Sequence, residues 1–306
     1  MKKLVPVLII SIFQLCAQAQ TPQRPHILGI DHVSFYTTHP DGVKKLYGDV
    51  LGLASVSPIE PGGTLRYLVG TQWVGYSPAP DPNSTDRMDH VALLTDNITA
   101  LRKYLIAQGI KVPQIQGQSD HSLFFVVNDP EGHKIEFVER DKGEAAPPAA
   151  PAVSKHMIHA GFLVYKREAT DHFYHDILGF RPYWHGGMKD DETSWVSFQV
   201  PDGTDWIEFM LYDPAGKDRH FLGVMNHIAL GVTDIQAAKA QLIKNGAKLT
   251  EEPKLGRDGK WQLNVYDPDE TRVEFMEFLP KEKPCCSEFT GPHPGSSAPP
   301  SAPSKP

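Results

Sequence analysis

The chain has 306 residues, which is enough for two domains with hydrophobic cores of ordinary size. Its composition, 40% hydrophobic and 22% charged, is that of a soluble globular protein. The formal net charge of -7 excludes nucleic acids and anionic membrane surfaces as expected partners, because an acidic surface repels both.

The first predicted element in chain order is a secretory signal at residues 1–19. Lys2 and Lys3 precede a short apolar run, LVPVLIISIFQL, and Ala17 and Ala19 form an A-x-A cleavage site. The run is shorter than the roughly 20 apolar residues of a transmembrane helix, so we expect no membrane span in the mature form. The sequence therefore predicts an exported protein, either periplasmic or secreted.

Two proline-rich stretches divide the rest of the chain. Residues 141–155, DKGEAAPPAAPAVSK, have the composition of an extended linker. Residues 281–306 contain too few apolar side chains to fold, and we expect a disordered tail there. Two bodies of similar size remain, at residues 25–140 and 156–280, and these are the predicted domains.

Cleavage of the signal removes Cys16 and leaves only Cys285 and Cys286, which are adjacent in the tail. A disulfide between neighbouring cysteines is strained and uncommon, so no internal cross-link framework is expected despite the oxidising compartment. The two thiols are candidates for binding a soft metal or for pairing with another chain. A solvated tail without a defined role is the simpler interpretation.

Each body contains two units of the same design. A unit opens with a short apolar strand that carries a histidine, continues into an amphipathic helix, and closes with several strands. The helices run through KKLYGDVLGL, LRKYLIAQGI, FYHDILGF and AKAQLIKNGA, and they stop at Gly52, Gly109, Gly179 and Gly246. Glycine just past the last helical residue is a common C-terminal stop.

The opening strands place their histidines beside small residues. These strands read GIDHVSFYT, MDHVALLT, MIHAGFLV and MNHIALGVTD, and they contain His32, His90, His159 and His227. Because side chains alternate along a strand, His159 shares its face with Gly161, and His227 shares its face with Ala229 and Gly231. The opposite face is bulky and suited to packing on a helix, so the histidine face has room for a ligand.

A glutamate follows three of the four histidines 46 to 49 residues later. These glutamates are Glu136 in KIEFVE, Glu208 in WIEFML and Glu274 in RVEFME. A single histidine of this kind would more often be a hydrogen-bonded structural residue than a ligand. Imidazoles and carboxylates at repeated positions are what a divalent-metal site needs, and the repetition therefore favours metal binding.

The whole pattern resembles the vicinal oxygen chelate superfamily, the group of glyoxalase I, extradiol dioxygenases, methylmalonyl-CoA epimerase and bleomycin-resistance proteins. The resemblance extends over all four units and is carried by DHVALLTDNITALRKYLIAQGI with DPEGHKIEFVE, and by NHIALGVTDIQAAKAQLIKNGA with DPDETRVEFME. It implies an α+β fold in which four βαβββ modules pair into two cup-shaped half-barrels of mixed sheet. Metal ligands in that family come from the first and last strands of each module.

The resemblance also implies a ligand set for each cup. The C-terminal cup has the four ligands of the bacterial glyoxalase I type: His159, Glu208, His227 and Glu274. The N-terminal cup has three: His32, His90 and Glu136. Gly75 stands where the fourth would be, and two histidines with one carboxylate form the facial triad of non-haem iron enzymes. Other histidines are pocket candidates (His121 and His185) or are expected at the surface or beside ligands (His26, His39, His133, His156, His172, His175, His220 and His293).

For the C-terminal cup the resemblance implies lyase or isomerase chemistry of the glyoxalase I type. One divalent ion (nickel, cobalt, manganese, iron or zinc) would chelate two adjacent oxygens of a small substrate and act as a Lewis acid. Glu274 is the expected base for the proton next to the carbonyl, with Glu208 as the alternative on the other side of the metal. Export weighs against substrates built on glutathione or CoA, which are mainly cytoplasmic.

Two other functions stay open. An Fe(II) extradiol dioxygenase would use His159, His227 and Glu274 or their N-terminal counterparts, and four units are typical of such enzymes. Its finer motif is absent, since Asn264 stands where a tyrosine would fall. The third function is a non-catalytic binding protein of the bleomycin-resistance type, and Gly75 in place of a carboxylate fits an N-terminal cup with that role.

Overall fold

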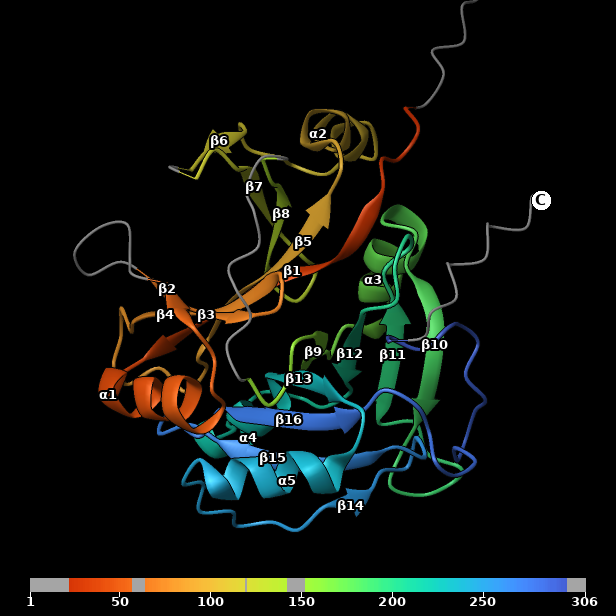
Figure 1. Ribbon diagram of the computed structural model, residues 1–306. Helices are drawn as coiled ribbons and strands as arrows, with labels where there is room; N and C mark the ends of the chain where they lie inside the picture. The colour runs from red at the N-terminus through yellow and green to blue at the C-terminus, as the bar shows by residue number, and fades with distance from the viewer. Residues whose placement is uncertain (1–21, 57–63, 119, 142–151, 296–306) are drawn as a thin grey trace, which may run out of the picture.

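The computed structural model describes residues 22–56, 64–118, 120–141 and 152–295 (Figure 1). The predicted signal at residues 1–19 lies outside the described residues, as do most of the predicted linker and the end of the tail. No helix in the described part of the chain combines the length and the apolar character that a membrane crossing requires.

The first half of the chain forms one eight-stranded sheet from two units, in the order β2-β3-β4-β1-β5-β8-β7-β6. Its strands are β1 (Ile27–Thr37), β2 (Ser55–Val56), β3 (Leu65–Val69), β4 (Gln72–Pro78), β5 (Met88–Thr95), β6 (Gln116–Gly117), β7 (Leu123–Asn128) and β8 (Lys134–Glu139). Its helices are α1 (Pro40–Val43), which continues as the π-helical segment η1 (Lys44–Val50), and α2 (Ile98–Ala107). The histidine strands β1 and β5 lie antiparallel at the centre of the sheet.

The second half repeats this arrangement in the order β10-β11-β12-β9-β13-β16-β15-β14. Its strands are β9 (Met157–Leu163), β10 (Arg181–Gly186), β11 (Trp195–Gln199), β12 (Trp206–Met210), β13 (His227–Val232), β14 (Lys254–Leu255), β15 (Trp261–Tyr266) and β16 (Arg272–Glu277). Its helices are α3 (Arg167–Asp171), continued by the π-helical η2 (His172–Ile177), α4 (Arg219–Met225) and α5 (Ile235–Lys244). The predicted α+β fold of two mixed sheets is confirmed, whereas α4 has no counterpart in the repeat and the sequence pattern does not predict it.

The four predicted helix stops are confirmed. Each stop residue has a positive φ, of 67°, 83°, 77° and 95° respectively, in the left-handed region that glycine favours: Gly52, Gly109, Gly179 and Gly246. The even-numbered units also begin their helices with a side-chain cap, since the side chains of Asn97 and Asp234 accept hydrogen bonds from backbone N–H groups in the first turns of α2 and α5.

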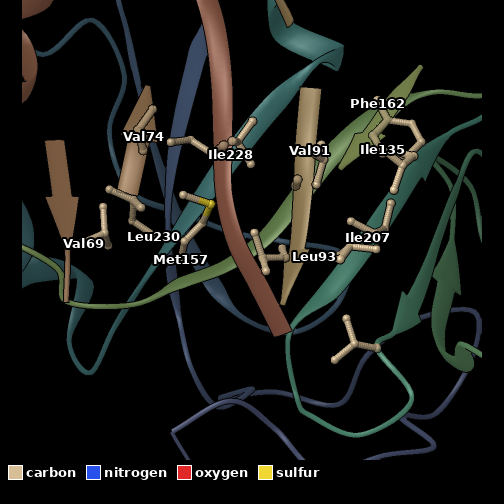
Figure 2. Close-up of a cluster of buried hydrophobic side chains, with 14 of the residues drawn as sticks. Val69, Val74, Val91, Leu93, Ile135, Met157, Phe162, Ile207, Ile228 and Leu230 are labelled. Carbon is tan, nitrogen blue, oxygen red and sulfur yellow. The ribbon is translucent and has the colours of Figure 1, made fainter. Parts of the chain in front are cut away.

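One hydrophobic core runs through both halves. Its buried members come from β1, β4, β5 and β8 of the first half and from β9, β12, β13 and β16 of the second. Figure 2 shows members from each half in this cluster, among them Val91 and Leu93 of β5 and Phe162 and Ile207 of the second sheet. Because the two halves share their buried apolar surface, we expect them to unfold together.

Buried hydrogen bonds join the halves at two positions related by the repeat. The carboxylate of Asp129, in the Asp-Pro turn of the second unit, accepts a bond of 3.1 Å from the hydroxyl of Tyr174 in η2. The carboxylate of Asp267, in the corresponding turn of the fourth unit, accepts a bond of 3.1 Å from the hydroxyl of Tyr76 in β4. The Asp-Pro turns seen in the sequence therefore fasten each half to the other.

Residues 281–295 are packed, which corrects the expectation of a disordered tail for this part of the chain. Phe289 packs on Tyr183 with ring centroids 4.9 Å apart, and the next backbone N–H donates to the carbonyl of Tyr183 at 3.0 Å. Composition missed this segment because one aromatic ring and a few backbone hydrogen bonds anchor it on β10. Cys285 and Cys286 are bonded to each other in a disulfide, which uses both thiols that the sequence leaves open for a soft metal or another chain.

Candidate metal centres

Four strands of the second half bring the predicted ligands of the C-terminal cup to one point. His159 on β9 and His227 on β13 have their Nε2 atoms 3.0 Å apart. Glu208 on β12 has Oε2 at 3.7 and 3.6 Å from these two nitrogens. Glu274 on β16 has Oε2 at 3.6 and 3.5 Å from the same two nitrogens. Residues from distant stretches of the chain thus form a set of two imidazoles and two carboxylates.

Gly161 makes room for this cluster. It lies opposite His227 in the antiparallel pair of β9 and β13, and opposite Glu208 in the parallel pair of β9 and β12. A Cβ atom at Gly161 would lie 2.1 Å from Cε1 of the His227 imidazole. The small residue on the histidine face, which strand alternation predicts, is therefore what allows the imidazole to reach its place.

The N-terminal cup gathers three ligands. His32 on β1 and His90 on β5 have their Nε2 atoms 2.9 Å apart, and the carboxylate oxygens of Glu136 on β8 lie 3.9 and 3.7 Å from them. Gly75 on β4 has the position that Glu208 has in the other cup, and a Cβ atom there would lie 2.5 Å from the ring of Trp73. The fourth carboxylate is thus replaced by an indole that stacks on His32, with centroids 3.6 Å apart.

The spacing in both cups fits a divalent ion. Ligand atoms about 2.1 Å from a metal stand about 3.0 Å apart at right angles and about 3.4 Å apart in a tetrahedron. The His–His separations of 2.9 and 3.0 Å match the first edge, and the His–Glu separations of 3.5 to 3.9 Å are only slightly longer than the second. In addition, Glu136 Oε1 is buried without a hydrogen-bond partner within the described ranges, a state that a cation would relieve. Each cup therefore holds a His/Glu set able to bind a divalent metal.

Carboxylates orient both imidazoles of the N-terminal cup. His32 Nδ1 lies 2.7 Å from the carboxylate of Asp31, and His90 Nδ1 lies 2.9 Å from that of Asp89. This pairing places the N–H on Nδ1 and leaves the lone pair on Nε2, as in many metal sites. Sequence reasoning missed both aspartates, although the Asp-His dipeptides in GIDHV and MDHV are a visible signal.

A guanidinium enters the C-terminal cup. His227 Nδ1 lies 2.8 Å from the backbone carbonyl of Met225, so its N–H is placed there and Nε2 is an acceptor. Nη2 of Arg272, on the same strand as Glu274, lies 2.7 Å from that Nε2. An ion and the guanidinium compete for one lone pair, so metal binding requires Arg272 to turn aside. Sequence reasoning did not single out Arg272.

The two carboxylates of the C-terminal cup have opposite pKa shifts. Burial, with the charge of Glu274, raises the pKa of Glu208 to about 8. Burial would raise the pKa of Glu274 as well, but Arg272 and His227 outweigh it, and the pKa falls to about 2. In the N-terminal cup burial raises the pKa of Glu136 to about 7. Without metal, therefore, Glu208 holds a proton at neutral pH while Glu274 is charged.

Metal binding to the C-terminal cup is expected to release a proton at neutral pH, because Glu208 must ionise to act as a ligand. The apparent metal affinity should rise with pH and level off above about 8. Calorimetric titrations in buffers of different ionisation enthalpy measure the number of protons released. The Glu208→Gln variant has no such proton and is the control. Equal proton release in the two proteins at neutral pH would contradict the shift.

A cavity opens beside each cup. The cavity of the N-terminal half has a volume of about 370 Å³ and includes His32. The cavity of the C-terminal half has a volume of about 320 Å³ and reaches Glu208 and Glu274. Together with charged and polar side chains, five aromatic ones line this second cavity: Tyr183, Trp184, Trp195, Trp206 and Phe289. His121 and His185, the two pocket candidates, line neither of these cavities.

Comparison with known proteins agrees with the geometry. The lactoylglutathione lyase of Haemophilus influenzae is 28% identical over 123 residues, which cover 40% of this chain and 91% of that protein. The Mn(II)-bound glyoxalase from Novosphingobium aromaticivorans has a TM-score of 0.66 at 19% identity, and the match covers 86% of each chain. The 2,3-dioxygenase LapB from Pseudomonas sp. KL28 has a TM-score of 0.66 at 15% identity over 86% of this chain and 97% of that one.

At these identities the two solved structures establish the fold alone. A family model covers more of the chain: the model described as Glyoxalase/Bleomycin resistance protein/Dioxygenase superfamily matches residues 29–137 and 156–275. Both matched segments contain the strands that carry the cup ligands, so each half of the protein is a domain of this family. The chain belongs to the glyoxalase/bleomycin resistance protein/dioxygenase superfamily.

Proposed function

We propose that the protein is a divalent-metal-dependent enzyme of the glyoxalase I-like type, a lyase or isomerase whose active site is the C-terminal cup. The observation that carries this proposal is that the Nε2 atoms of two imidazoles lie 3.0 Å apart and that each of two carboxylates has an oxygen 3.5 to 3.7 Å from both of them. The proposed ligands are His159, Glu208, His227 and Glu274. When bound there, the ion would supply Lewis acidity toward two adjacent oxygens of a small substrate. The similarity to a lactoylglutathione lyase supports the same class.

Glu208 is the proposed proton carrier, in preference to Glu274, the first choice from sequence. Its side chain is 14% exposed against 4% for Glu274, and it lines the cavity. Within the described ranges no lysine or arginine forms an ion pair with Glu208, whereas Arg272 holds Glu274 in its charged form. A carboxylate at the cavity wall can take a proton from the carbon next to a carbonyl and return it to the neighbouring carbon.

Replacing Glu208 by alanine is expected to weaken metal binding in the C-terminal cup and to slow proton transfer about a hundredfold to ten-thousandfold. The matched Glu136→Ala change removes the carboxylate of the N-terminal cup and should leave the rate unchanged. Deuterium exchange from solvent into dihydroxyacetone, followed by NMR, measures the transfer for the metal-loaded protein. Loss of exchange in Glu136→Ala, with exchange intact in Glu208→Ala, would move the activity to the other cup.

A second function, Fe(II)-dependent extradiol ring cleavage, is favoured by one observation at the N-terminal cup. Its imidazoles are oriented by Asp31 and Asp89, and the fourth carboxylate is replaced by Gly75, which is the donor set of a facial triad. Oxygen uptake with catechols after anaerobic loading with Fe(II) tests this function. Oxygen uptake that is lost in His90→Ala and retained in His227→Ala would support this function. If no oxygen is taken up, the N-terminal cup has a scaffold role or a binding role of the bleomycin-resistance type.

The proposed export of the mature protein rests on the signal at residues 1–19. N-terminal sequencing of the protein recovered outside the cytoplasmic membrane tests it, with Gln20 expected as the first residue.

A further inference from the structure

Two buried hydrogen-bond donors in the cavity of the C-terminal cup have no partner. Arg272 Nε and Trp206 Nε1 are both inaccessible to solvent, and neither meets an acceptor within the described residues. Both side chains line the cavity of about 320 Å³ that reaches Glu208 and Glu274. Trp206 is itself only 2% exposed. Buried donors are rarely left unpaired in native proteins, so a guanidinium in this state beside a cavity points to an acceptor that a ligand brings.

Arg272 in particular makes no direct contact with a carboxylate of the described chain, although its charge acts on Glu274 from beyond ion-pair distance. Its one side-chain hydrogen bond joins Nη2 to His227 Nε2, and no aspartate or glutamate of the described chain forms an ion pair with it. A metal ion on His227 would take that lone pair and leave the guanidinium without an acceptor. Arg257, on the same cavity wall, differs because it is paired with Asp190. An unpaired guanidinium fork is suited to binding a carboxylate through two parallel hydrogen bonds.

Part of the cavity wall is suited to a flat apolar body. That part consists of Tyr183, Trp184, Trp195, Trp206 and Phe289, and polar side chains line other parts, among them Lys254, Asp258 and Gln262. Aromatic walls with a few convergent polar groups are the usual form of a small-molecule site, and a volume near the lower end of the range of about 300–1,000 Å³ limits the ligand to a compact one.

We propose that the substrate of the C-terminal cup is a small aromatic or apolar molecule that carries a carboxylate besides its two adjacent oxygens, and that Arg272 forms the subsite for that carboxylate. The inference rests on the proposed function, because it assumes that the adjacent oxygens face the His/Glu set. The carboxylate accepts hydrogen bonds from the guanidinium fork of Arg272. Arg272 is then the residue that selects anionic over neutral substrates.

Three probes with the same pair of adjacent oxygens test the subsite: protocatechuate, which is anionic, catechol, which is neutral, and dopamine, which is cationic. They are titrated calorimetrically into the Zn²⁺-loaded full chain with the His90→Ala change. This change disables the N-terminal cup, so that only binding to the C-terminal cup is measured. We expect protocatechuate to bind about tenfold to a hundredfold more tightly than catechol, and dopamine to bind more weakly than catechol.

The Arg272→Gln variant should bind protocatechuate no more tightly than catechol, and its Zn²⁺ content, measured on the same sample, shows whether the cup still holds the ion. Arg257→Gln, on the same wall, is the matched control and should keep the preference. Equal affinity of the unsubstituted cup for protocatechuate and catechol, or a preference that survives Arg272→Gln, would overturn the inference.

Metal content, measured on every sample, separates this inference from the proposed function. If the cup takes up no Zn²⁺, the proposed function fails. The subsite is then tested on the metal-free protein with benzoate and benzyl alcohol, which need no metal. A preference for benzoate that Arg272→Gln removes would keep the anion subsite, and equal affinities would overturn it.

Discussion

Replacing Gly161 by alanine is expected to abolish metal binding in the C-terminal cup, although the change removes no ligand. The added Cβ atom would lie 2.1 Å from Cε1 and 2.5 Å from Nδ1 of His227, so the imidazole must leave its place. We expect metal affinity to fall by more than about a hundredfold and the free energy of unfolding to fall by about 1–3 kcal/mol from overpacking. Competition with a chromogenic chelator and urea denaturation measure the two effects.

The N-terminal cup differs at this position. There Ser34 has the position of Gly161, and Gly75 has the position of Glu208, so the glycine stands on the neighbouring strand. Gly117→Ala, whose Cβ atom would approach another side chain no closer than 3.9 Å, is the neutral control. Unchanged metal affinity in Gly161→Ala would contradict the geometry of the cup.

Asp129→Ala is expected to cause a large loss of stability, although Asp129 lies outside the cups. The carboxylate of Asp129 accepts a hydrogen bond from Tyr174 of the other half at 3.1 Å. It also accepts bonds of 2.9 Å from the backbone N–H groups of Glu131, Gly132 and His133. Each unsatisfied buried donor costs about 1–3 kcal/mol, and water entering the turn offsets part of this, so we expect a loss of about 3–4 kcal/mol.

The control for this change is Asp81→Ala. Asp81 accepts a bond of 2.9 Å from the backbone N–H of Asn83 in an exposed turn, and we expect its loss to cost about 1 kcal/mol or less. Because the core crosses both halves, both variants should unfold in one transition, with circular dichroism and tryptophan fluorescence changing together. Unchanged stability in Asp129→Ala, or separate unfolding of one half, would contradict the shared core.

Features that depend on local sequence could be predicted. The four helices end where glycine follows the last apolar position, because a left-handed residue is a local requirement. The alternation of side chains along a strand identified the histidine face and the small residue, Gly161, beside it. The repeat then related the four strands to one another, so the residues that converge in each cup could be named before their distances were known.

Features that depend on contacts between distant elements could not be predicted in this way. Arg272 is the first residue of β16, where a polar side chain is ordinary, and only the register of β13 against β16 directs it to His227. The core shared by both halves has no signature in either half alone, since each apolar face is compatible with packing on its own helix. The packing of the segment after residue 280 depends on the ring of Phe289 and a few backbone hydrogen bonds. The average composition of the segment does not reveal such contacts.

The most direct test of the central claim is the metal content of the full chain by mass spectrometry after removal and replacement of divalent ions. With the N-terminal triad disabled by His90→Ala, the protein should bind one ion per chain. Adding His159→Ala should remove that ion, because the cluster loses one of its two imidazoles. No ion in the first variant, or an ion that survives the second change, would contradict a metal centre formed by His159, Glu208, His227 and Glu274.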